Sequence, residues 1–290
     1  MPIQFIAPAQ RFVLNIDQQN IALQDMSGGH VEGEVVTVRD GATQQTSKSI
    51  SRVRFTPFVL KIGAPIGKTL AEWARTCADL KPMKKSGYVA AIDLNGRIQG
   101  YRHFRDALIE KITVPAMDGA SKEAAIFTIT LEADGITYAP GDNTTVAGNV
   151  ANKPWLSSNF RFRLGDLPCS RVAKVDSFTI NQEIFESASG TSRISTKQPA
   201  GVDFPNLKVT FAATDAAPWH DWFTDLVVNG NTGKELKGSL EFLGPDLSPV
   251  GRIDFLQVGI FSLHEDRTGA QDTVARYVAE LYVEKMTLAL

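Results

Sequence analysis

Hydrophobic and polar residues alternate along most of the chain with a period of two, which is the pattern of strands that bury one face. In RFVLNI (residues 11–16), Phe12, Leu14 and Ile16 share one face, and FTITLE (127–132) repeats the alternation. The chain is therefore expected to be rich in strands. Further strands are predicted at residues 30–38 and 57–63.

One segment has the spacing of a helix instead. In TLAEWARTCADL (69–80), apolar residues recur every three or four positions, at Leu70, Trp73, Cys77 and Leu80. Thr69 stands where an N-cap residue is expected. The run YVAAIDLNGRIQGYRHF (88–104) then predicts a hairpin, because Asn95-Gly96 is a strong signal for a two-residue turn.

The pattern stops and then restarts. APGDNTTVAGNVANKPWLSS (139–158) has the Pro, Gly, Asn, Thr and Ser content of a linker. After it, strands, a polar loop, a strand, a Trp-bearing helix, a hairpin and a closing strand follow in the earlier order. We predict a first domain at residues 1–140, a linker at 141–158 and a second domain at 159–290.

Aligning the two halves supports a tandem duplication. Trp73 falls on Trp222 and Glu34 falls on Glu183, each pair being 149 residues apart. Offsets of 150 and 148 match the remaining strands, 127–131 with 277–281 and 12–16 with 160–164. Small shifts between elements are what loop insertions and deletions produce in a duplicated sequence.

The turn before the helix resembles a phosphate-binding loop, in which glycine amides, a lysine and a threonine hold phosphates and magnesium. Here those residues would be Gly63, Gly67, Lys68 and Thr69. Only three residues separate the glycines where the motif needs four, and no parallel βαβ pattern surrounds them. In the second copy the corresponding residues are Ala212, Ala216, Ala217 and Pro218. We interpret the segment as a strand-to-helix turn.

Composition excludes several classes of protein. A formal net charge of −2, with 43% hydrophobic and 21% charged residues, is typical of a soluble globular protein without nucleic-acid or membrane affinity. Cys77 and Cys169 are too few for a disulfide framework and are interpreted as free buried thiols. The N-terminus lacks signal-peptide features, and no apolar run reaches the roughly 18 residues that span a bilayer. We expect synthesis in the cytoplasm.

Candidate chemistry is sparse. The four histidines lie far apart, without a second ligand at metal spacing, at His30, His103, His220 and His264. There is no nucleophile elbow and no Cys/His pair in a nucleophile's context. We therefore predict no catalytic residues, no metal site and no cofactor, and a protein that is not an enzyme.

Two polar segments occupy matching places in the two copies, VRDGATQQTSKSIS (38–51) and ESASGTSRISTKQPAG (186–201). They are interpreted either as flexible surface loops or as arms that order against a neighbouring subunit, since long polar loops inside compact domains are unusual without a use. Under the second interpretation the candidate assembly contacts are Thr43, Gln44, Gln45, Ser47, Lys48, Ser187, Ser189, Thr191, Arg193 and Lys197.

The order of elements resembles the tail-tube proteins of contractile phages and related injection systems. The segments that carry the resemblance are residues 88–136 of the first copy and 235–288 of the second, the latter with a turn at Gly244-Pro245-Asp246. The strands around Glu34 and Glu183, each leading into a polar segment, match the family's opening half. The resemblance implies a mainly β chain with two tandem β-sandwich or barrel domains, each with one flanking helix.

The resemblance also implies a structural role. Tail-tube domains sit side by side and continue a β-sheet around a six-fold ring, usually with one domain per chain. A two-domain chain would complete a pseudo-six-fold ring with three copies, which suits a tube subunit, or an initiator that joins the tube to a trimeric spike or hub. The expected partners are further tube subunits, the spike or hub, and sheath or baseplate proteins, within a phage tail or injection-system particle.

A binding module is the rival interpretation. A tandem β-sandwich could recognise a glycan or a protein through its loops, with Trp155, Trp219 and exposed tyrosines as stacking surfaces, although a lone Trp is more often buried. Such a module would stay monomeric, whereas a tube or adaptor protein would associate through its strand edges.

Overall fold

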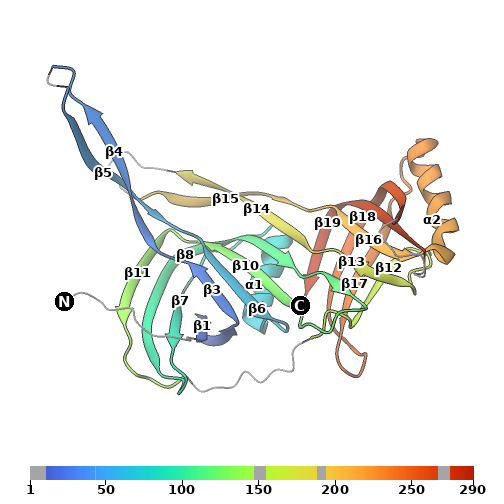
Figure 1. Cartoon of the computed structure of the whole chain (residues 1–290), viewed down its shortest axis with the longest axis horizontal. Coiled ribbons are helices and arrows are strands. Elements are labelled where there is room, and N and C mark those ends of the chain that lie inside the picture. Colours follow the sequence, from blue (N-terminus) through green and yellow to red (C-terminus); the bar gives the residue numbers. More distant parts are fainter. Residues whose placement is uncertain (1–10, 43, 147–154, 188–193, 267–274) are drawn as a thin grey trace.

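The computed structural model describes residues 11–42, 44–146, 155–187, 194–266 and 275–290. Strands predominate in this part of the chain, and two sheet-built units lie side by side (Figure 1). Each unit carries one α-helix, α1 (Lys68–Ala78) in the first and α2 (Ala216–Phe223) in the second. The short helical turns η1 (Ala213–Asp215) and η2 (Thr224–Val228) flank α2. The mainly β fold predicted from the sequence, with two tandem units and one helix each, is confirmed.

The first unit is an antiparallel sheet. Its strands lie in the order β2-β1-β7-β8-β10-β6-β3, and β11 also pairs with β8. Their bounds are β1 (Arg11–Ile16), β2 (Gln19–Leu23), β3 (Asp25–Gly28), β6 (Phe58–Gly63), β7 (Lys85–Ile92), β8 (Ile98–Val114), β10 (Ile126–Glu132) and β11 (Gly135–Pro140). Between β3 and β6 the chain forms a separate hairpin of β4 (Val31–Arg39) and β5 (Thr46–Phe55).

The second unit repeats this topology. Its sheet has the order β12-β17-β18-β19-β16-β13, which is the order β1-β7-β8-β10-β6-β3 of the first unit, element for element. The bounds are β12 (Phe160–Leu164), β13 (Val172–Val175), β16 (Leu207–Ala212), β17 (Leu236–Leu243), β18 (Pro249–Asp266) and β19 (Arg276–Ala289). The single strand β19 takes the place that β10 and β11 together occupy in the first unit.

Strand register reproduces the sequence offsets. Phe127 lies opposite Ile62, and Tyr277, which is 150 residues further on, lies opposite Phe211. A bulge recurs at the same place, because β8 skips Glu110 against β10 and β18 skips Phe261 against β19. Matching bulges are inherited features of a strand pair rather than accidents of packing, so the register supports duplication independently of residue identity.

The two helices show where the sequence prediction was right and where it was wrong. Trp73 and Trp222 are both buried, and each indole N–H donates to a backbone carbonyl of the loop after its helix, at Met83 and Lys234. The predicted N-cap at Thr69 is wrong, because α1 begins one residue earlier and Gly67, with φ 84°, is the N-cap. The side chain of Thr69 instead donates to the Gln19 side chain.

The C-terminal end of the predicted helix is also wrong. Helix α1 ends at Ala78, and Leu80 is 56% exposed with a positive φ of 61°, so it is not the fourth buried residue of the helical stripe. The Asn95-Gly96 hairpin between β7 and β8 is confirmed. Its turn bonds recur between β17 and β18, where Leu247 takes the place of Gly96 and donates its N–H to Gly244.

The two polar segments are shorter loops than the sequence indicates. Most of residues 38–51 belongs to β4 and β5, and the end of 186–201 belongs to β15 (Thr196–Asp203), which pairs with β14 (Phe178–Ser187). Ser- and Thr-rich strands of this kind lack apolar alternation because the hairpin has no buried face to fill over most of its length. The prediction of loops was therefore wrong for residues 46–51 and 196–201.

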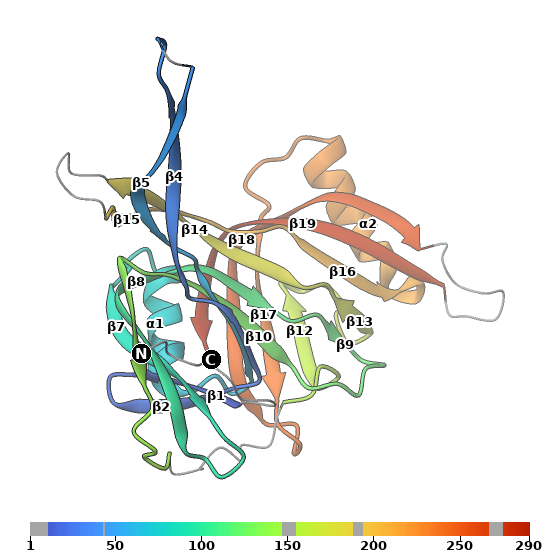
Figure 2. The ribbon, with the colours of Figure 1, turned by 60° about the vertical axis from the view of Figure 1, so that its left-hand side comes forward.

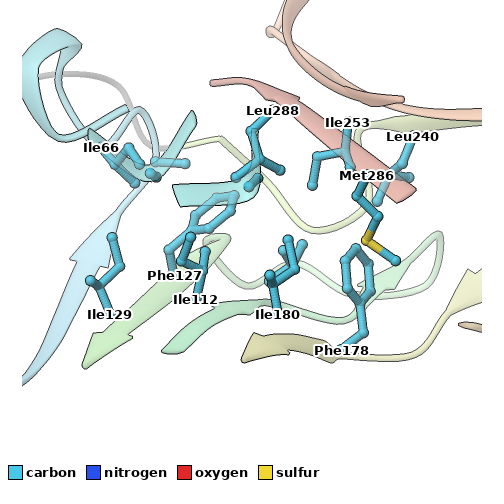
Figure 3. Close-up of a cluster of buried hydrophobic side chains, with 14 of the residues drawn as sticks. Ile66, Ile112, Phe127, Ile129, Phe178, Ile180, Leu240, Ile253, Met286 and Leu288 are labelled. Carbon is cyan, nitrogen blue, oxygen red and sulfur yellow. The ribbon is translucent and has the colours of Figure 1, made fainter. Parts of the chain in front are cut away.

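The two units exchange strands. The short strand β9 (Met117–Asp118) of the first half pairs with β13 of the second, and β14 of the second half pairs with β8 of the first. Side chains from both halves meet in one core, which contains Ile112 and Phe127 of the first half and Leu240 and Met286 of the second (Figure 3). The domain boundaries at residues 140 and 158 stay a prediction, and residues 147–154 of the predicted linker lie outside the described residues.

Candidate assembly interface

The hairpin β14–β15 joins the two units by adding a strand to the first sheet. Thr179 lies opposite Thr113 and Ile180 opposite Ile112 in the antiparallel pairing of β14 with β8. The threonine hydroxyls are hydrogen-bonded at 2.8 Å, and Ser177 Oγ donates to the Val114 carbonyl at 2.8 Å. Strand addition of this kind satisfies an otherwise open sheet edge.

Apolar packing fixes the base of this hairpin. Phe178 and Ile180 are buried and point into the shared core beside Ile112, and Phe178 also lies beside Met286 (Figure 3). Because these side chains come from one unit and their neighbours from both, the contact between the units is part of the hydrophobic core. It is not a polar surface contact of the kind that allows domains to move apart.

Further along the hairpin, Lys197 of β15 reaches the loop between β10 and β11. Its side chain is 5% exposed, and its ammonium group pairs with the carboxylate of Glu132 and lies 3.7 Å from Glu186 Oε1. Its backbone N–H donates to Asp134 Oδ1 at 2.6 Å, while Lys84 holds the other oxygen of that carboxylate at 2.7 Å. Two lysines thus neutralise an acidic cluster at the junction of the two units.

Burial affects the ionisation of one member of this cluster, Glu132. Desolvation raises the pKa of Glu132 above its ordinary value, and the hydrogen bond and charge of Lys197 oppose that effect. Beside the cluster lies an open hollow of about 420 Å³, lined by carboxylates and by one cation, Lys197. Losing the lysine would leave buried carboxylates without compensation.

The matching hairpin of the first unit has no such neighbour. Strands β4 and β5 pair with each other and with no other strand of the described residues, and they project away from both units (Figure 2). Val35 is 59% exposed and Ile50 is 57% exposed. Only the base is tied down, where the Val31 N–H donates to the Tyr138 hydroxyl at 3.1 Å.

The second unit in turn has an edge without a strand. Register places Ser262, Leu263 and His264 of β18 where the first unit has residues 111–113 of β8. These residues pair with β19 on one side, and within the described ranges no strand pairs with them on the other. The molecule therefore presents a projecting hairpin, β4–β5, in the first unit and an open edge, β18, in the second. Their counterparts, β14–β15 and β8, pair with each other within the chain.

The candidate contact residues fall into three groups. Lys197 contacts the other unit of the same chain, a role that the sequence interpretation did not foresee. Gln44, Gln45, Ser47 and Lys48 lie at or near the tip of β4–β5, and Ser187 ends β14. Thr43, Ser189, Thr191 and Arg193 lie outside the described residues. Their role as contacts between subunits stays a prediction.

The aromatic residues of the rival interpretation are in the core. Trp155 is buried and stacks on Phe242 with 5.4 Å between ring centroids, and Trp219 is buried against Phe211 at 4.5 Å. Neither side chain offers a stacking surface to a ligand. The sequence signal for this was the helical spacing of Trp219 and Trp222, which places both toward the sheet.

Other chemistry is limited in the described residues. No group of three or more His, Cys, Asp or Glu side chains there is placed to hold a metal ion. Neither helix in this part of the chain is long and apolar enough to cross a bilayer. The segment that resembles a phosphate loop is a turn between β6 and α1, and Ile66 within it is buried in the core.

Comparison with known proteins bears out the family resemblance. Residues 8–137 match the family described as T4-like virus tail tube protein gp19. The match covers most of the first repeat, so the chain is similar to tail-tube proteins over those residues. The second repeat is connected to this family through the shared strand order and register. No curated protein matches the chain.

Several solved structures are similar to this chain at low identity. A chain of the sheath–tube complex of an extracellular contractile injection system, PVC, is 21% identical, covers 48% of this chain and 94% of its own, and has a TM-score of 0.42. A chain of the tube-terminating cap of the anti-feeding prophage is 23% identical, with coverages of 48% and 95% and a TM-score of 0.42. Hcp1 from Flavobacterium johnsoniae is 13% identical, with coverages of 44% and 94% and a TM-score of 0.26.

Proposed function

We propose that three copies of this chain form a pseudo-six-fold ring in a tail tube, with the two repeats alternating around it. The observation that carries the proposal is that a hairpin and a sheet edge pair with each other within the chain, while the equivalent hairpin and edge have no such partner in the described residues. Hairpin β14–β15 of the second repeat docks on β8 of the first. Hairpin β4–β5 and the β18 edge are the same two elements without their partners.

A ring follows from repeating this contact. If β4–β5 of one chain docks on β18 of the next as β14–β15 docks on β8, every unit meets its neighbour in the same way. A head-to-tail contact between identical chains closes into a ring when its rotation divides the circle, and otherwise makes a filament. Family tubes are six-fold, so six units supplied by three chains would continue that geometry.

Three-fold true symmetry suits one position in a tail. The two repeats differ in sequence, so the faces of such a ring would be six-fold in backbone and three-fold in side chains. We propose an adaptor or initiator that joins a six-fold tube to a trimeric spike or hub, with sheath or baseplate proteins around it. The role needs no catalytic residue and no cofactor.

The test is the mass of the purified protein as concentration rises, followed by negative-stain imaging of the large species. Three chains per ring would support the proposal. Six chains per ring would keep the tube function and refute the alternation of repeats. A chain that stays monomeric at high concentration, and also when mixed with tube and spike proteins of its own system, would refute the assembly role.

A further inference from the structure

Each repeat has a site at which the lysine of a hairpin could dock, and the charged residues of these two sites differ. On the hairpin side, Lys197 of β15 corresponds to Lys48 of β5. The two lysines are 149 residues apart, lie ten residues before the next strand, and occupy matching rungs, opposite Glu186 and Thr37. Each hairpin therefore carries a lysine at the same height.

On the acceptor side, register assigns the counterparts of the acidic cluster. Glu132 lies opposite Leu108, and Tyr282 lies opposite Gly259 at the equivalent rung. Two residues further along, Asp134 of the first repeat corresponds to Glu284 of the second. The carboxylate that receives the Lys197 backbone N–H thus has an exposed carboxylate as its counterpart.

The third member of the cluster changes sign. Lys84, which neutralises Asp134 in the first repeat, corresponds through the β7 and β17 registers to Glu235. Glu235 accepts a hydrogen bond from the Tyr282 hydroxyl at 3.1 Å, which holds it beside the counterpart of Glu132. Where the first repeat has two carboxylates and its own lysine, the second has two carboxylates and a tyrosine.

Charge complementarity therefore points to one occupant. Lys48 is exposed and forms no ion pair within the described residues, and Glu235 and Glu284 form none there either. A lysine entering this site would meet two carboxylates and a phenol oxygen. The corresponding lysine of the second repeat, Lys197, is already bound by the acidic cluster of the first repeat, and its side chain is 5% exposed.

We infer that Lys48 at the tip of hairpin β4–β5 docks between Glu284 and Glu235 of a second copy of this chain. The inference rests on the proposed function, because it names the contact that would close the ring. It also assigns the order of repeats. The site of the first repeat is occupied by Lys197 and neutralised by Lys84, so the arm of another chain can only address the second repeat.

Strand pairing at the base of the same contact would place Val31 opposite Leu263, as Ile180 lies opposite Ile112. The Val31 N–H, which donates to Tyr138 in the isolated chain, would then exchange that bond for a backbone carbonyl of the neighbour.

Charge reversal tests the contact directly. Lys48→Glu and Glu284→Lys should each weaken ring formation by about thirtyfold or more, and the double variant Lys48→Glu/Glu284→Lys should recover most of that loss. The matched control is Lys122→Glu, an exposed lysine in the connection between β9 and β10, which should assemble like the unmodified chain. Sedimentation velocity over a concentration series gives the association midpoint of each variant.

Cross-linking supplies the second readout. Two differently tagged chains, one with Lys48→Cys and one with Glu284→Cys, should be joined by a short bismaleimide, whereas Lys122→Cys with Glu284→Cys should not. The native cysteines will not interfere at neutral pH, since burial raises the pKa of Cys77 to about 12 and that of Cys169 to about 11.

The outcomes separate the inference from the function on which it rests. Rings that tolerate both charge reversals and give no cross-link would overturn the Lys48 contact and keep the ring. A specific cross-link without closed rings would keep the contact and overturn the three-chain geometry. Absence of both rings and cross-link would overturn the proposed function and the inferred contact with it.

Discussion

The hairpins β4–β5 and β14–β15 have the same place in the chain, the same pairing and a bulge at nearly the same rung, yet they have different surroundings. One is covered by a sheet edge and held by buried carboxylates, and the other projects with its apolar side chains exposed. The two hairpins differ in their strand pairing: β14 pairs with β8 of the first repeat, whereas β4 and β5 pair only with each other within the described residues.

This comparison teaches how to read a duplicated protein. The contact between β14–β15 and β8 shows how a hairpin and a sheet edge pair with each other, and hairpin β4–β5 and the β18 edge show the equivalent elements without such a partner in the described residues. The first hairpin is an exposed two-stranded sheet that pairs with no further strand of the described residues, and natural proteins usually avoid such open edges unless another chain covers them. Its exposure in a single chain is therefore the feature that needs an explanation.

The largest expected difference between the hairpins concerns their lysines. Lys197→Ala should lower the free energy of unfolding by about 4 kcal/mol, because it leaves Glu132 buried without its cation. Lys48→Ala should change it by less than about 0.5 kcal/mol in the isolated chain, as expected for an exposed side chain. Urea unfolding followed by tryptophan fluorescence measures both. Equal effects would mean that β14–β15 is not docked in solution.

A smaller difference in the free energy of unfolding is expected between the apolar residues at matching positions of the two hairpins. Ile180→Ala should cost about 3 kcal/mol, since its side chain is buried in the shared core. Val31→Ala, at the matching rung, should cost well under about 1 kcal/mol while the chain is monomeric. The comparison fails if Val31→Ala is as costly as Ile180→Ala at dilutions where only monomers are present.

The equivalence of the repeats can be tested at their helices. Trp73→Phe and Trp222→Phe each remove an indole N–H that donates to a loop carbonyl and should each cost about 1–2 kcal/mol. Similar losses are expected because the two indoles do the same work in their own units. The same unfolding assay, followed by circular dichroism, measures them. A large loss in one variant only would show that the two helices are not equivalent in energy.

The smallest expected effect lies in the turns. Leu247 has a positive φ of 61°, where its counterpart Gly96 has 77°. Leu247→Gly should stabilise the fold by about 0.5–1 kcal/mol, because it relieves a left-handed conformation that a side chain disfavours. Gly96→Leu is the reciprocal variant and should destabilise it. A rise in Tm for Leu247→Gly in differential scanning calorimetry is the expected sign, and a fall would contradict the equivalence of the two turns.

Local patterns predicted most of the elements. Alternation located β1, β6 and β10, the Asn95-Gly96 pair located a hairpin, and residue offsets gave the duplication that the registers then reproduced. The hairpin strands were missed because Ser and Thr at both faces remove the alternation that marks a half-buried strand. The N-cap was misplaced because Gly67 caps through its backbone conformation, with no side-chain signal.

Only part of the candidate interface could be predicted from the sequence. The polar segments pointed to Lys48 and Lys197. No local pattern indicates that β14 pairs with β8, because the paired residues Thr113 and Thr179 are 66 residues apart in the sequence. The sequence does show two lysines at the same offset as the two tryptophans. A role in docking can be inferred for these lysines only when the acidic residues opposite each lysine are known. Those come from strand register.

The core shared by the two units has a kinetic consequence. In a ring of six single-domain chains, six contacts between chains must each form at the correct angle. In the proposed ring, three of the six contacts between units lie within a chain, where the core that includes Ile112, Ile180 and Met286 fixes their angle in advance. Such a ring would need only three contacts between chains, formed in two bimolecular steps and one closure, and its nucleus would form at lower concentration than that of a single-domain tube. A chain built in this way would assemble first, and set the diameter that later subunits copy.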